Sequence, residues 1–186
     1  MKSIRMLFQI LLFCSLALAP LAQSDQSDNR LEALFQNLKN SQDDEVLQAT
    51  ESSIWEIWYE SGDDEIDAIM QEAGLAVQSG QLRLAESMYD RVIEKLPGFS
   101  EGWNRRATVR FYQRDLDGSL ADIEQTLRLE PRHFGAIWGL GMILGSKQDY
   151  QRAILAFQRL LEIKPNARDA RPRIELLKQE LAKQAV

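Results

Sequence analysis

The chain has 186 residues, of which 45% are hydrophobic and 27% charged, a composition typical of one folded domain rather than of a disordered chain. Its 22 basic and 28 acidic residues give a net charge of -6, and an acidic surface repels phosphate backbones, which argues against a nucleic-acid partner. The single cysteine, Cys14, lies in the N-terminal apolar run, so the rest of the chain offers no disulfide, thiol nucleophile or cysteine metal site.

Residues 1–22 are predicted to form a secretory signal peptide. Lys2 and Arg5 precede an uncharged stretch from Met6 to Ser24, and small residues follow its apolar centre. This pattern predicts a periplasmic or secreted protein. An uncleaved membrane anchor is the alternative, because the 19 uncharged residues are just enough to span a bilayer. Residues 23–28 are polar and are expected to form a disordered linker.

Residues 29–62 are predicted to form an N-terminal helical hairpin that packs against the first repeat unit as a cap. Apolar residues at helical spacing mark its two helices: Leu31, Leu34, Phe35 and Leu38, and then Val46, Ile54, Trp55, Ile57 and Trp58. Acidic clusters at 43–45 and 63–65 are expected just before helices, where carboxylates favour the positive end of the helix dipole.

Three prolines, Pro97, Pro131 and Pro165, follow one another at intervals of 34 residues, and each ends a similar six-residue segment. Proline cannot continue a helix, so a helix is expected to end in each of these segments. Counting back from each end gives three units, 66–99, 100–133 and 134–167. Small residues recur at equal offsets in them: Ala73, Ala107 and Gly141, and then Ala85, Ser119 and Ala153. Small side chains at fixed places let two antiparallel helices in each unit approach closely.

This period and these positions resemble the tetratricopeptide repeat (TPR), and the chain also resembles small exported TPR proteins of alphaproteobacteria. The resemblance implies an all-α, right-handed superhelix of antiparallel helix pairs within residues 63–186. A capping helix over Asp169–Lys183 is expected to follow the repeats, with Asp169 as its N-cap. Three residues depart from the family pattern: Arg106 and Arg110 stand where apolar side chains are usual, and Arg114 stands where glycine is frequent.

The sequence predicts no catalytic site, cofactor or metal site. The one histidine, His133, falls at a turn between units and is expected to bond to local backbone rather than to a nucleophile. Four arginines, Arg105, Arg106, Arg110 and Arg114, follow one helix of unit two. They are expected to pair with nearby carboxylates such as Asp122, and a strip for an acidic peptide is the alternative.

The resemblance implies that the first helix of each unit lines a concave groove. Seven residues are predicted to bind a partner in or beside it: Met70, Asn104, Arg105, Thr108, Phe111, Trp138 and Met142. The lysine–asparagine clamp with which some family members hold a carboxylate is not reproduced at these places. The competing prediction is that the N-terminal hairpin folds into the groove and buries these residues.

The predicted function is that of an exported adaptor or scaffold that binds a peptide or a partner helix in the groove. The alternative is a membrane-tethered, homo-oligomeric component of an envelope complex. The sequence leaves the oligomeric state open.

Overall fold

The structure is a computed structural model, and it describes residues 28–184. The predicted signal peptide, and all of the linker but residue 28, lie outside this range. Within residues 28–184 the chain forms nine helices and no strand: α1 (Arg30–Asn40), α2 (Asp44–Tyr59), α3 (Asp64–Gln78), α4 (Leu82–Lys95), α5 (Ser100–Tyr112), α6 (Leu116–Leu129), α7 (Phe134–Ser146), α8 (Tyr150–Ile163) and α9 (Ala170–Gln184). None of these helices is long and apolar enough to cross a bilayer.

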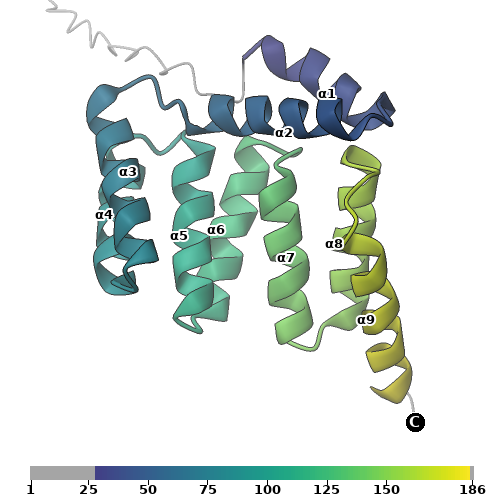
Figure 1. Ribbon diagram of the computed structural model, residues 1–186. Coiled ribbons are helices and arrows are strands. Elements are labelled where there is room, and N and C mark those ends of the chain that lie inside the picture. The colour runs from purple at the N-terminus through teal and green to yellow at the C-terminus, as the bar shows by residue number, and fades with distance from the viewer. Residues whose placement is uncertain (1–27, 185–186) are drawn as a thin grey trace, which may run out of the picture.

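The prediction of an all-α array of helix pairs is confirmed for this range. The pairs α3–α4, α5–α6 and α7–α8 stand side by side, each packed on the next, and α9 follows α8 at the end of the row (Figure 1). The six small residues that recur in the repeats are all buried. At Gly141 the reason is direct, because a Cβ there would lie 2.6 Å from Cζ of Phe157.

The turn inside each unit has a residue with positive φ at the same place. Gly80, Arg114 and Gln148 have φ values of 71°, 70° and 61°. This region favours glycine because a side chain crowds the backbone there. The geometry explains why glycine is frequent at the position of Arg114, and unit two adopts the same turn without it.

The acidic clusters mark helix starts, as predicted. Asp43 accepts hydrogen bonds from the backbone N–H groups of Glu45 and Val46, and so caps α2. Asp63 caps α3 in the same way, through Glu65 and Ile66. These carboxylates satisfy amides that have no partner within the helix.

The predicted position of the N-terminal hairpin is wrong. Its helices α1 and α2 do not share the apolar cluster of unit one; they share one with α7, α8 and α9, which includes Trp58, Phe134 and Leu144. In Figure 1, α2 runs across the ends of α5, α6 and α7 and reaches α8. The physical reason is that α7 and α8 present apolar side chains, such as Phe134, Ile137 and Leu160, that the apolar face of α2 can bury.

An ion network joins unit two to unit one, beside the apolar contact that Val109 of α5 makes with the cluster of unit one. Asp122 of α6 is 2% exposed and accepts hydrogen bonds from Arg106 at 2.7 and 2.9 Å and from Arg110 at 3.0 Å. The same arginines reach Asp90 and Glu86 on α4 at 2.7 and 2.9 Å. Arg106 and Arg110 therefore pair with carboxylates, as predicted, and they link α4, α5 and α6 across the boundary between units one and two.

Replacing Asp122 with Asn should lower the free energy of unfolding by about 3 kcal/mol, because two largely buried guanidinium groups lose their shared carboxylate. Asp117→Asn is the matched control, since Asp117 is exposed and pairs with Lys147 at the surface. That change should cost less than about 1 kcal/mol. Urea denaturation of both variants tests this, and equal losses would contradict it.

Candidate functional site

The inner faces of α5 and α7 enclose a cavity of about 180 Å³, here called the inner cavity. It is lined by five of the seven residues predicted to bind a partner: Asn104, Thr108, Phe111, Trp138 and Met142. All of these except Asn104 are half-buried, so they keep surface for a ligand. The structure thus brings together the predicted residues of units two and three.

The other two predicted residues lie elsewhere. Met70 is buried in the apolar cluster of unit one, which joins α3 and α4 to Val109 of α5. Methionine is flexible and fills such gaps readily, so its side chain packs inward. Arg105 lies under α2, with its guanidinium 4.6 Å from the ring centroid of Tyr59 and 5.9 Å from that of Trp55.

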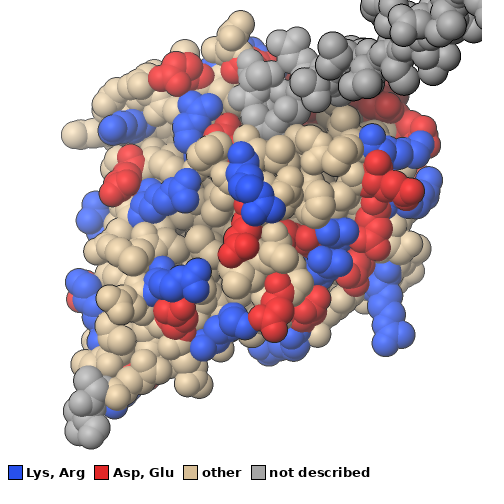
Figure 2. Space-filling view, turned by 180° about the vertical axis from the view of Figure 1, so that it is seen from behind, with Lys and Arg blue, Asp and Glu red and all other residues tan. Residues whose placement is uncertain are grey.

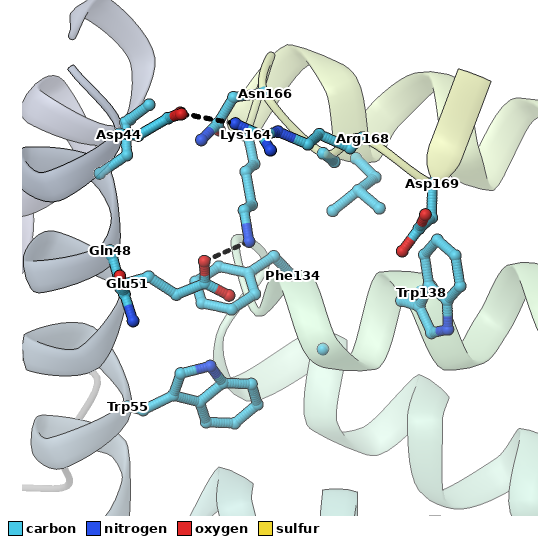
Figure 3. Close-up of a pocket in the computed structure, with 14 residues that line it drawn as sticks. Asp44, Gln48, Glu51, Trp55, Phe134, Trp138, Lys164, Asn166, Arg168 and Asp169 are labelled. Atoms are coloured by element: carbon cyan, nitrogen blue, oxygen red, sulfur yellow. Dashed lines mark hydrogen bonds and ion pairs between the residues drawn. The ribbon is translucent and has the colours of Figure 1, made fainter. Parts of the chain in front are cut away.

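A larger cavity of about 650 Å³, here called the hairpin cavity, lies between α2 and unit three (Figure 3). Helix α2 forms one wall with Asp44, Gln48, Glu51 and Trp55, and the segment between α8 and α9 forms the other with Lys164, Asn166, Arg168 and Asp169. Gly135 and Trp138 line both this cavity and the inner cavity. The two cavities therefore adjoin at these residues, and they are together called the groove here. The hairpin cavity was not predicted from the sequence, because α2 was expected elsewhere.

Packing fixes the aromatic walls of this groove. The Trp138 ring packs edge-on against Phe157, with centroids 5.0 Å apart, and Trp55 packs edge-on against Phe134 at 5.2 Å. Gly135 admits Trp55, because a Cβ at Gly135 would lie 2.6 Å from Cη2 of that indole. Gly139 lets Ile123 of α6 approach, because a Cβ at Gly139 would lie 3.2 Å from Cδ1 of that side chain.

His133 joins α2 to the repeats and lies at the boundary of the groove. Its ring stacks on Trp58 of α2, with centroids 4.0 Å apart and planes 8° from parallel. Nδ1 accepts a hydrogen bond from the N–H of Ala136 at 3.1 Å, so His133 caps α7. Nε2 therefore carries the ring proton and donates it to Glu101 at 3.0 Å. The predicted bond to local backbone is present, but the links to α2 and α5 were missed.

Glu101 is fully buried and its carboxylate is well satisfied. Besides His133, it accepts hydrogen bonds from Asn104 at 2.8 Å and Arg105 at 2.5 Å. Burial, and then the charge of Glu101, raises the pKa of Tyr89 to about 12, and burial lowers the pKa of Arg105 to about 10. Tyr89 therefore stays neutral and Arg105 stays charged at neutral pH. The amide of Asn104 already donates to the buried Glu101, so it is not free to bind a ligand through that hydrogen.

The hairpin thus covers one end of the groove and leaves the rest open. Glu101, Asn104 and His133 are buried beneath or beside α2, whereas Phe111 and Trp138 remain half-buried. Among residues 28–184, no group of His, Cys, Asp and Glu side chains could hold a metal ion. Both nitrogens of His133 are occupied by structural hydrogen bonds, so this ring does not activate a nucleophile.

Stacked helix pairs with a groove along their inner side define a helical repeat protein of the solenoid class. The family described as Tetratricopeptide repeat matches residues 104–168. A TPR repeat-containing protein from Rhizobium etli is 35% identical over 159 residues, which cover 86% of this chain and 78% of that protein. The chain therefore belongs to the tetratricopeptide repeat family, and the resemblance seen in the sequence is confirmed.

Solved structures show the same fold. The first TPR domain of Spaghetti (RPAP3), bound to the HSP90 peptide SRMEEVD, matches with a TM-score of 0.62 and 19% identity over 64% of this chain and 96% of that chain. The Sgt2 TPR domain from Aspergillus fumigatus matches with a TM-score of 0.62 and 18% identity over 66% and 83%. These likenesses confirm the TPR-type superhelix.

Replacing His133 with Ala should cost about 3 kcal/mol and loosen the hairpin, because the change removes a helix cap and leaves a buried carboxylate short of a donor. Amide hydrogen exchange should quicken in α1 and α2 relative to the rest of the chain. Asp149→Ala is the control: it removes the N-cap of α8 without touching the hairpin, and should cost about 1 kcal/mol. Unchanged exchange in α2 of the His133 variant would show that the histidine does not hold the hairpin.

Proposed function

We propose that this chain is an exported adaptor that binds a peptide or a partner helix in the groove between α2, α5 and α7. The observation that carries the proposal is that the inner cavity and the hairpin cavity adjoin at Gly135 and Trp138, which line both of them. Together they offer an elongated, aromatic-walled groove rather than a closed pocket for a small molecule. A segment of extended or helical peptide is the ligand that suits such a shape.

Affinity would come from burying half-exposed aromatic side chains. Phe111, Trp138 and Trp55 are large apolar groups whose burial against a partner is worth more than that of most surface residues. Their rings are already held by packing, so binding would cost little side-chain entropy. This preorganisation favours recognition of a partner over an incidental apolar patch.

The charge of the molecule supports a protein partner rather than nucleic acid. Basic and acidic side chains lie interspersed on the face seen in Figure 2, and the net charge is -6. The arginines of α5 that face Asp122 and Glu101 are already paired. A phosphate backbone would find no continuous basic strip on that face.

Replacing both Phe111 and Trp138 with Ala should reduce capture of the protein partner at least tenfold, because the two rings line the middle of the groove. Capture by the purified chain from extracts, followed by mass spectrometry, is the measurement. Leu155→Ala is the control, because Leu155 is a 58% exposed apolar residue on the outer helix α8. If the double variant captures the same proteins as the unaltered chain, groove binding is wrong.

Export is the second part of the proposal, and it depends on the basic start and the uncharged run of residues 1–22. A fusion of these residues to alkaline phosphatase, which is active only outside the cytoplasm, should show activity in a bacterial host. Changing Leu11 and Leu12 to Arg breaks the apolar run and should abolish that activity. Activity that survives this change would argue against a signal peptide.

A further inference from the structure

We infer that the hairpin cavity receives a lysine or arginine side chain of the bound peptide, held between the Trp138 ring and the carboxylate of Asp169. The inference depends on the proposed groove function and adds the chemistry of the partner. It starts from the charges that line this cavity: three carboxylates, Asp44, Glu51 and Asp169, and two cations, Lys164 and Arg168.

Four of these five charges are already paired. Lys164 donates to Glu51 inside the cavity, with only 16% of its side chain exposed, and it also lies 5.3 Å from the ring centroid of Phe134. Arg168 donates to both oxygens of Asp44, at 2.8 and 2.7 Å, on the exposed rim. These pairs leave Asp169 as the carboxylate with no side-chain partner among residues 28–184.

Asp169 and Trp138 both line the hairpin cavity, and in the view of Figure 3 the Asp169 carboxylate is drawn toward the Trp138 ring with no dashed line reaching it. An indole face attracts a cation through its quadrupole, and a neighbouring carboxylate adds a direct charge interaction. The combination suits an ammonium or guanidinium group and disfavours an anion. The cavity of about 650 Å³ has room for such a side chain together with the adjoining peptide backbone.

The inference separates this chain from the structural neighbour that holds the acidic peptide SRMEEVD. An acidic peptide would bring like charge to Asp169 and would find Lys164 and Arg168 already paired. A basic residue of the peptide would instead pair with Asp169, the one charged residue of the cavity that has no ion pair within the described part of the chain. The partner of this chain is therefore a basic segment whose apolar flank lies against Phe111 and Met142 in the inner cavity.

A positional-scanning library of hexapeptides, blocked at both termini, tests the inference with the purified full chain. Bound peptides should be enriched in Lys or Arg at one position and depleted in Asp and Glu there. The best Lys peptide should lose about tenfold in affinity when its Lys is replaced by norleucine. Asp169→Asn should cause a similar loss for the Lys peptide and almost none for the norleucine peptide.

Asn keeps the shape and the helix-capping capacity of Asp169, so this variant is expected to fold. Glu162→Gln is the control, because Glu162 is an exposed carboxylate on α8 outside the cavity. Enrichment of acidic residues, or a Lys preference unchanged in Asp169→Asn, would overturn the inference. Peptide binding without a preference for Lys or Arg would contradict this inference but not the proposed groove binding. If no peptide binds at all, both the inference and the proposed groove binding are wrong.

Discussion

The contact between α2 and the start of α7 decides the shape of this protein. Helix pairs in a repeat array bury their apolar faces only against neighbours, so every end and edge needs a partner. Here Trp58 stacks on His133, and His133 caps α7 while it bonds to Glu101 of α5. One buried imidazole therefore joins three helices from separate parts of the sequence, and the hairpin cavity exists because α2 is held where it is.

The same region shows how the chain balances buried charge. Glu101 and Asp122 are both inside the fold, and each is surrounded by two or three donors. Such groups are costly to bury alone, and once paired they tolerate few alternative arrangements. The polar contacts thus fix how α5 meets its neighbours, at positions where other members of the family use apolar packing. Arg106 and Arg110 depart from the family pattern because their charge is used here.

Much of the repeat architecture could be predicted from spacing. Pro97, Pro131 and Pro165 follow helix ends, and the recurring small residues mark contacts between helices, because a 34-residue period repeats the same local packing. The position of the hairpin could not be predicted in this way. Its amphipathic pattern shows that α1 and α2 have an apolar face but not which surface that face covers. His133 appeared to be an ordinary turn residue for the same reason, since its partners Trp58 and Glu101 are distant in sequence.

Contacts between segments that are distant in the sequence matter most for the candidate groove, and spacing alone does not predict them. The part of the groove that depends on the repeat, with Thr108, Phe111, Trp138 and Met142, follows from the family register, so those residues could be found without coordinates. The part built by the hairpin depends on a contact between α2 and unit three, and it is lined by charged side chains from both, such as Glu51 and Lys164. Of the five charged residues that line the hairpin cavity, only Lys164 belongs to a repeat unit, so the register of the family gives no signal for the other four.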